Sequence, residues 1–370
     1  MAENKYNTRD FGNIYRFIYR NQNCSRLSIA KSLHISRPTV IHNLKLLQES
    51  GLVYTDSTLE STGGRKPSVF RCTADARFSI GIDITQNHLS LVLINLNLDI
   101  IDSLRLRCPF EDAEEYYDNL LHEFTVFLEK QDIDRRLILG IGVSLPAHIA
   151  RDQKSISYAT IIHVSGSIYD KLQCRLPYPL LLFNDANSAG LAESWFSSSD
   201  APIVYLFLSN SVGGSLMQSG TIYNGDNWRA CEFGHMCIVP HGRKCYCGNY
   251  GCLDAYCSAK TLTNFTDGNL KDFFSQMKAG NIGFRQLFNE YLDYLAIAVN
   301  NLRVCYDANI ILGGTIGPYM AEYLDEFRQK AAALNSFDDD GNYVQACHYQ
   351  TEAAAVGAAI YYINEFIESL

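Results

Sequence analysis

Four residues with zinc-ligand chemistry gather in one short part of the chain. His235 is followed by the segment C-Y-C-G-N-Y-G-C at 245–252, which contains two glycines. Three thiolates and one imidazole complete a tetrahedral zinc shell, and glycines let the backbone turn tightly enough for the sulfurs to converge. A catalytic zinc keeps an open position, so four protein ligands favour a structural ion. We predict a structural Zn²⁺ bound by His235, Cys245, Cys247 and Cys252.

The number of cysteines and the lack of a long apolar run indicate the cellular compartment in which the protein works. Twelve cysteines in 370 residues do not resemble the disulfide frameworks of small secreted domains, which favours a reducing cytoplasm. The chain opens on polar residues and has no apolar run near the roughly 20 residues that span a bilayer, so we expect no membrane partner. We expect three further cysteines to be small buried side chains instead of ligands: Cys231, Cys237 and Cys257.

Polar residues with acid–base chemistry follow a buried strand and precede the zinc motif. Asn184 and Asp185 come directly after the apolar run 180–183 and before a predicted helix at 188–196. A carboxylate at the C-terminal end of a strand is well placed to accept a proton or a ligand hydroxyl, although Asn-Asp also fits a helix N-cap. Glu232 adds a carboxylate beside His235, whose second ring nitrogen can donate to a substrate oxygen when zinc holds the first.

The elements around these residues divide into a basic first part and an acidic remainder. Residues 1–76 carry 11 Lys/Arg and 6 Asp/Glu, whereas the whole chain has a net charge of −9. Such a division is typical of a DNA-binding module joined to a sensor or an enzyme. After residue 77 the pattern is α/β, and strand hairpins followed by helices occur twice, which predicts two related lobes. The expected strands are 78–84, 89–96, 100–107, 137–143, 180–183, 204–208 and 310–312, and the further helices are 111–131, 284–306 and 352–366.

The basic part has the pattern of a winged helix-turn-helix. Residues 11–18 have helical apolar spacing, Ser25 caps a short helix with Leu27, Ala30 and Leu33 inward, and Ser36 caps a third helix that ends at Gly51. Strands at 52–54 and 69–71 then form a hairpin whose tip holds Arg65 and Lys66, which suits a phosphate or a narrow minor groove. A packing module with a solvated loop is the alternative. The residues expected to contact DNA are Arg37, Thr39, His42, Asn43 and Lys45 on the third helix, with Arg65 and Lys66 at the tip.

The winged helix, N-D-A at 184–186, E-F-G-H at 232–235 and the cysteine motif occur in an order that resembles the ROK family (repressors, open reading frames and sugar kinases). This resemblance spans essentially the whole chain. It implies an α/β protein, in which an N-terminal winged helix-turn-helix precedes a two-lobed, actin/hexokinase-like (ribonuclease H-like) body with a sugar in its cleft. It also implies sugar contacts from Asn184, Asp185, Glu232, His235 and Asp254, with Asp185 as the catalytic base only in kinase members.

The chain departs from the kinase members of that family at the phosphate-binding loops. Their D-x-G-G-T-K reads D-I-T-Q-N-H at 83–88, and the second loop, at 208–215, keeps a single glycine pair. Glycines let backbone amides approach phosphate, so we do not expect ATP as a cofactor or an enzymatic activity. In the sugar site, P-G has become Pro146-Ala147 and the usual Glu of G-C-x-E is Asp254.

Together these features predict a cytoplasmic, sugar-responsive transcriptional regulator, a repressor of carbohydrate-utilisation genes. We expect a DNA-binding domain at 1–76 and a sugar-binding body at 77–370, with lobe one at about 77–195 plus the C-terminal helix and lobe two at about 196–350. The expected partners are a double-stranded operator, a sugar effector and further copies of the chain in a homodimer or homotetramer. The alternatives are an active ATP-dependent sugar kinase with an accessory DNA-binding domain, and a scaffold that has lost its ligand.

Overall fold

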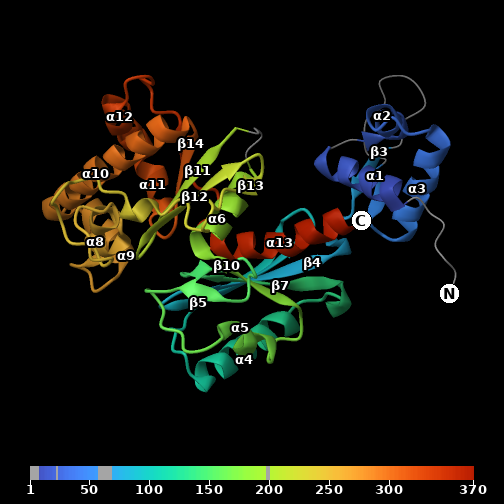
Figure 1. Ribbon diagram of the computed structural model, residues 1–370, viewed down its shortest axis with the longest axis horizontal. Coiled ribbons are helices and arrows are strands. Elements are labelled where there is room, and N and C mark those ends of the chain that lie inside the picture. Colours follow the sequence, from blue (N-terminus) through green and yellow to red (C-terminus); the bar gives the residue numbers. More distant parts are fainter. Residues whose placement is uncertain (1–7, 22–23, 57–68, 197–200) are drawn as a thin grey trace.

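The computed structural model of the protein describes residues 8–21, 24–56, 69–196 and 201–370 (Figure 1). Three bodies follow one another along the chain: a small helical head, a first α/β lobe and a second α/β lobe. None of the described helices is both long enough and apolar enough to cross a membrane.

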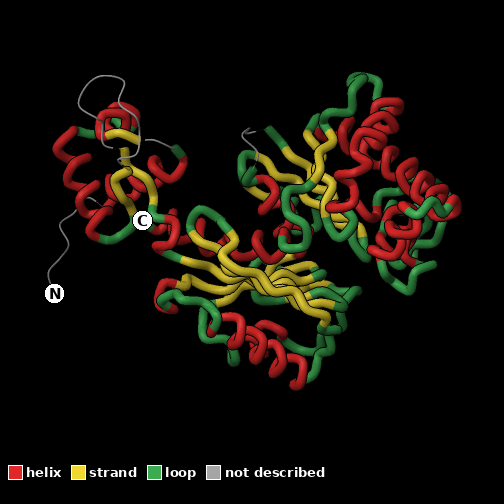
Figure 2. Tube along the Cα trace, turned by 180° about the vertical axis from the view of Figure 1, so that it is seen from behind, coloured by secondary structure: helices red, strands yellow, loops and turns green. Residues whose placement is uncertain are grey.

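The head consists of three helices and a small antiparallel sheet in the order β1-β3-β2 (Figure 2). The side chains of Ser25 and Ser36 cap the second and third helices as predicted, and Gly51 follows the third helix with φ of +73°. Leu27 is 57% exposed, so its predicted inward position is wrong. Arg65 and Lys66 lie outside the described residues. The elements are α1 (Thr8–Arg20), β1 (Cys24–Ser25), α2 (Arg26–Ser32), α3 (Arg37–Glu49), β2 (Val53–Asp56) and β3 (Val69–Cys72).

Lobe one is built on a five-stranded sheet in the order β6-β5-β4-β7-β10. The hairpin pairs are antiparallel, whereas β7 and β10 join in parallel. Its strands are β4 (Phe78–Ile84), β5 (His88–Asn95), β6 (Ile100–Arg107), β7 (Ile138–Leu145) and β10 (Leu180–Asn184). The other elements are α4 (Glu114–Glu129), β8 (His148–Ile149), β9 (Ile156–Tyr158), α5 (Ile168–Gln173) and the short 3₁₀ turns Ala74–Ala76 and Arg135–Leu137.

Lobe two repeats this arrangement, because its sheet runs β13-β12-β11-β14-β15 with the same sequence of antiparallel and parallel pairings. The two related lobes predicted from the sequence are therefore confirmed. The strands are β11 (Ile203–Leu208), β12 (Val212–Gln218), β13 (Thr221–Ile222), β14 (Asn309–Gly313) and β15 (Val344–Ala346). The helices are α7 (Asp254–Cys257), α8 (Ala259–Thr263), α9 (Leu270–Lys278), α10 (Ile282–Tyr306), α11 (Gly317–Met320) and α12 (Leu324–Leu334), with 3₁₀ turns at Phe233–His235 and Ala321–Tyr323.

Two helices, α6 (Asp185–Ser194) and α13 (Ala353–Ser369), lie side by side between the sheets (Figure 1). Glycines in the first sheet let α13 pack closely against it. A Cβ added at Gly81 would lie only 1.9 Å from the carbonyl oxygen of Ala355. A Cβ on Gly142 would lie 2.0 Å from the carbonyl oxygen of Ala358. The backbone of α13 therefore rests directly on β4 and β7.

The head is docked on the far end of α13. The Arg16 guanidinium donates to the carbonyl oxygens of Ile367 and Glu368, at 3.2 and 3.3 Å. The Tyr19 hydroxyl donates to the carbonyl oxygen of Leu96 at 2.7 Å. Buried residues of α1, α13 and the first sheet also belong to one hydrophobic cluster. The head therefore shares a core with lobe one.

Candidate functional site

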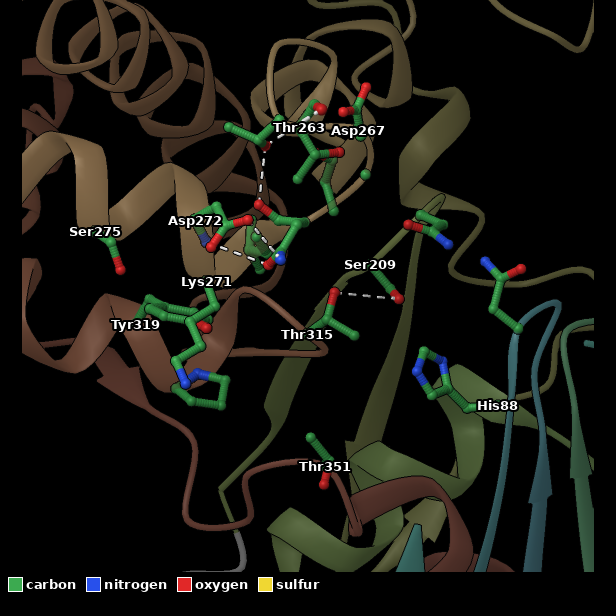
Figure 3. A pocket seen from close by; sticks show the side chains of 18 of the residues that line it. His88, Ser209, Thr263, Asp267, Lys271, Asp272, Ser275, Thr315, Tyr319 and Thr351 are labelled. Atoms are coloured by element: carbon green, nitrogen blue, oxygen red, sulfur yellow. Dashed lines mark hydrogen bonds between the residues drawn. The ribbon is translucent and has the colours of Figure 1, made fainter. Parts of the chain in front are cut away.

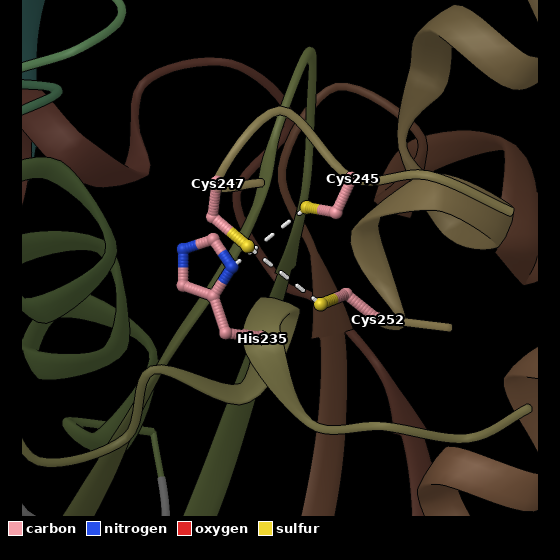
Figure 4. A group of neighbouring side chains, drawn as sticks. All are labelled: His235, Cys245, Cys247 and Cys252. Carbon is pink, nitrogen blue, oxygen red and sulfur yellow. Dashed lines mark hydrogen bonds between the residues drawn. The ribbon is translucent and has the colours of Figure 1, made fainter. Parts of the chain in front are cut away.

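The four predicted zinc ligands converge in lobe two (Figure 4). Their ligand atoms all lie within 4.8 Å of one another, with Cys247 Sγ 3.8 Å from Cys252 Sγ and Cys245 Sγ 3.9 Å from His235 Nδ1. Two sulfurs of a tetrahedral site with Zn–S bonds of about 2.3 Å are separated by roughly 3.8 Å. The donor set and its spacing therefore fit zinc, and His235 keeps Nε2 on the other side of its ring.

The spare cysteines follow the prediction only in part. Cys257 is buried, Cys231 is half-buried and Cys237 is exposed. The prediction is wrong for Cys237 because this residue bridges to the zinc-loop residue Cys252 through the backbone and turns its thiol outward, where it contacts the carbonyl oxygen of Tyr250 at 3.8 Å.

Asp185, Glu232 and His235 line one small cavity of about 90 Å³, hereafter the carboxylate pocket. The helix predicted at 188–196 begins earlier, at Asp185, so this carboxylate lies in the first turn of α6. Asn184 also lines the pocket, but its side-chain oxygen caps α6 by accepting from the backbone of Asn187, and its amide donates to Ala147. The N-cap alternative is therefore correct for Asn184, while the Asp185 carboxylate lines the pocket and accepts from the backbone N–H of Ala186 at 2.9 Å through Oδ1.

Burial changes the acid–base behaviour of this site. Desolvation, with the nearby charge of Asp83, raises the pKa of Asp185 to about 7. Desolvation also raises the pKa of Asp83 to about 6. A 2.8 Å hydrogen bond from the Ser144 hydroxyl opposes this rise but does not cancel it. Two close carboxyls that ionise near neutral pH are typical of functional sites.

His148 and Tyr158 are among the pocket residues that were not predicted as site residues. His148 Nε2 lies 3.4 Å from Glu232 Oε1, and the ring of His148 packs near that of Tyr158. His148 follows the altered Pro146-Ala147 pair, and this departure is the one signal in the sequence that points to it. Glu232 is thus oriented by lobe one although it belongs to lobe two.

Asp254 lies outside the residues that line the carboxylate pocket. It is buried, and its Oδ2 accepts from the backbone N–H of Val212 at 2.6 Å. Burial raises the pKa of this carboxyl, although the hydrogen bond from Val212 lowers it in part. In this structure Asp254 holds Val212, the first residue of β12, which lines the pocket.

A much larger cleft, of about 1460 Å³, separates the lobes beyond the carboxylate pocket (Figure 3). Its wall includes the two altered loops, represented by Thr85 and Ser209. The Thr85 hydroxyl accepts from the backbone N–H of His88 at 2.9 Å and so closes its own turn. Cationic side chains from β6 line the same wall, namely Arg105 and Arg107. The wall of this cleft therefore combines residues of the loops at 83–88 and 208–215 with two cations from β6.

The predicted DNA-contacting residues on α3 fall into two groups. Arg37, His42 and Lys45 are exposed, and Thr39 is half-buried with its hydroxyl 2.7 Å from that of Ser36. Asn43 is 5% exposed and its amide donates to the carbonyl oxygen of Thr39 at 2.9 Å, so its predicted place on the outer face is wrong. Its short side chain folds back onto the preceding turn instead of reaching solvent. Ile41, 49% exposed on the outer face, is an apolar residue that the prediction missed.

Comparison with protein-family models matches residues 79–365 to the ROK family. The chain belongs to the ROK family. A second match assigns a winged helix-turn-helix DNA-binding domain to residues 12–54 of this ROK protein. The predicted fold class, a winged helix-turn-helix followed by a two-lobed α/β body, is confirmed.

Curated relatives of this ROK protein include sugar repressors. It is 24% identical over 306 residues to the xylose repressor of Bacillus subtilis (strain 168), an alignment that covers 80% of this chain and 79% of the other. It is 26% identical over 245 residues to the DNA-binding transcriptional dual regulator NagC of Escherichia coli (strain K12), which covers 65% and 60%.

Solved structures with the same fold include regulators and kinases. A ROK family transcriptional regulator, described as a homologue of the E. coli MLC protein, has a TM-score of 0.74 at 17% identity and covers 97% of both chains. A ROK family glucokinase from Streptomyces griseus, in complex with glucose and AMPPNP, has a TM-score of 0.65 at 22% identity and covers 77% of this chain and 98% of that one. At these identities the likeness establishes the fold.

Proposed function

We propose that this ROK protein is a sugar-responsive DNA-binding repressor of carbohydrate-utilisation genes. The observation that carries the proposal is the joining of a winged helix with an exposed cationic face to a body whose pocket presents two carboxylates and an imidazole. Relatives named as a xylose repressor and as NagC support the same reading. We keep the division into residues 1–76 and 77–370, with the lobe limits given above, as part of this proposal.

A sugar fits the carboxylate pocket because each hydroxyl both donates and accepts hydrogen bonds. Ionised Asp185 and Glu232 would accept from ring hydroxyls, and His235 Nε2 would donate to a ring oxygen. Asn184 would orient Asp185, to which its amide donates at 3.2 Å. Asp254 would act through β12 instead of touching the sugar.

Zinc would have a structural role in this mechanism. Four protein ligands leave no open position for a reacting water. When bound, the ion supplies folding free energy to the loop at 235–252 and fixes the orientation of His235. The chain itself would contribute Nε2 of His235 to sugar binding. This nitrogen stays exposed and lies 3.4 Å from the Tyr246 hydroxyl.

Helix α13 provides the physical connection from body to head. Its last turn accepts the Arg16 hydrogen bonds, while its first half packs on β4, β7 and α6. Two or four copies of the chain would pair their heads on the half-sites of a near-palindromic operator. A sugar that binds one arrangement of the lobes more tightly would change the spacing of the heads and release the DNA.

One observation favours a second function, that of an active ATP-dependent sugar kinase. Burial raises the pKa of Asp185 to about 7, as a general base near neutral pH requires, and the body also contains a cleft of about 1460 Å³. Against this reading, the loops at 83–88 and 208–215 lack most of the glycines that bring backbone amides to phosphate. Release of ADP with a panel of hexoses, pentoses and N-acetylated sugars separates the two functions, and turnover at ordinary enzyme rates would establish the kinase.

The test of the repressor begins with a thermal-shift panel of sugars, since a ligand of the folded state raises the melting temperature. Any sugar that binds is then added to the protein on its operator. Glu232→Gln keeps the size of the side chain but removes its charge, so we expect normal operator binding without a sugar response. Glu129→Gln, an exposed carboxylate at the end of α4, is the matched control. A normal response in Glu232→Gln would remove that residue from the site.

A further inference from the structure

A second cavity adjoins the carboxylate pocket and has about twice its volume, 180 Å³ against 90 Å³. Both are lined by His148, Asn184 and Glu232, so the two spaces meet at the same carboxylate. We call this space the side cavity. A ligand held by Glu232 can therefore extend into it.

The side cavity contains a buried hydroxyl without a partner. Ser188 on α6 is 2% exposed, lines the cavity, and its Oγ makes no hydrogen bond among the described residues. A buried polar group left unpaired destabilises the fold, so such groups in native proteins point to water or to a ligand. The amides of Gln153 and Asn187 line the same space and add donors and acceptors.

Apolar rings form another part of the wall. Trp228 and Tyr361 line the cavity, and Tyr361 packs against Phe183 with ring centroids 5.3 Å apart. A wall of aromatic faces, amides and a hydroxyl matches a sugar ring, which has apolar C–H faces and polar edges. Among the described residues that line the side cavity there is no Lys or Arg, so an anionic group would meet the charge of Glu232 without a lysine or arginine to offset it.

The volume also fits one ring. A buried water needs roughly 10–15 Å³ of cavity volume, so 180 Å³ holds on the order of ten waters. One neutral sugar ring has a similar number of non-hydrogen atoms. By the same measure the carboxylate pocket, of about 90 Å³, encloses roughly half of a ring, so the rest of the first ring would lie outside it. We propose that the side cavity binds the second ring of a neutral disaccharide or glycoside whose first ring occupies the carboxylate pocket.

This inference rests on the proposed function and makes its effector more specific. Gly357 and Tyr361 belong to α13, the helix on which the head is docked. None of the described residues that line the carboxylate pocket belongs to α13, so a single ring there would not touch this helix. A second ring would touch the helix directly.

Calorimetric titration of the full chain tests the proposal with paired probes: D-glucose against maltose and cellobiose, and D-xylose against xylobiose. We expect at least one disaccharide to bind about tenfold or more tightly than its monosaccharide. Ser188→Ala should weaken that disaccharide by about three- to tenfold, the equivalent of one hydrogen bond, and leave the monosaccharide unchanged. Its fold is safe because the hydroxyl it loses has no partner among the described residues.

Ser194→Ala is the matched control, since Ser194 lies on the same helix but its hydroxyl donates to the carbonyl oxygen of Leu191. Disaccharides that bind no tighter than their monosaccharides, or a Ser188→Ala effect equal on both, would overturn the side-cavity proposal while leaving the sugar-responsive function intact. Failure of every mono- and disaccharide to bind would overturn both.

Discussion

Replacing Asp185 by Asn should stabilise the protein, and more so at high pH. Folding raises the pKa of this carboxyl from its ordinary value near 3.8 to about 7. The folded chain therefore binds the proton more tightly than the unfolded chain between about pH 4 and pH 7. The free energy of unfolding consequently falls as the pH rises through that window. Asn cannot ionise, so Asp185→Asn removes this loss.

The size of the expected stabilisation follows from the pKa shift of Asp185. At about 1.4 kcal/mol for each pKa unit, a rise from 3.8 to about 7 corresponds to roughly 4 kcal/mol once the carboxyl is fully ionised. Part of this loss is already present at pH 5, and the pocket is accessible to water, so we expect about 2 kcal/mol more stabilisation at pH 8 than at pH 5. For lobes of this size, that difference is a shift of about 4–8 °C in melting temperature.

The assay is scanning calorimetry of wild type and Asp185→Asn at pH 5 and pH 8. Each variant is compared with wild type at the same pH, which cancels the protonation of zinc ligands. Asp132→Asn, an exposed aspartate after α4, is the control and should shift neither melting temperature. An Asp185→Asn shift of equal size at both pH values, or a lower melting temperature at pH 8, would refute the burial argument.

Three other outcomes are expected. Cys247→Ser should lose its metal by mass spectrometry and melt at a lower temperature, whereas Cys237→Ser, at an exposed non-ligand position, should keep both; full zinc content in Cys247→Ser would contradict the site. Arg16→Ala removes two hydrogen bonds to α13, so sugar affinity should persist while the sugar-induced release of operator weakens several-fold in an anisotropy titration; an unchanged release would exclude this contact from the coupling. Arg65→Ala should weaken binding to all DNA sequences and lower the salt slope by about 1, and an unaltered slope would argue against the wing.

Local signals made much of the fold predictable. The caps at Ser25 and Ser36 and the stop at Gly51 each depend on a few neighbouring residues, and the structure has all three. The zinc ligands were equally accessible, because three of them lie within eight positions and the glycines between them allow tight turns. Errors arose where one side chain had two local choices: the amide of Asn43 bonds to its own helix instead of facing out.

Contacts between distant segments could not be predicted in this way. His148 and Glu232 come from different lobes, and Arg16 meets the last turn of the chain at Ile367. No periodicity or motif encodes such pairs, since they depend on how both sheets pack on α6 and α13. The raised pKa of Asp185 belongs to the same class, because it requires the burial that only the assembled site provides.

The tight seating of the two central helices has a consequence for genetics. Besides Gly81 and Gly142, a Cβ on Gly190 would lie 1.9 Å from the Ser215 hydroxyl, and one on Gly357 would lie 1.7 Å from the carbonyl oxygen of Ser188. A single added methyl group at any of these positions would wedge the layers apart. Screens for alleles with impaired folding should therefore recover substitutions at these four glycines, although none of them is a predicted DNA contact or metal ligand.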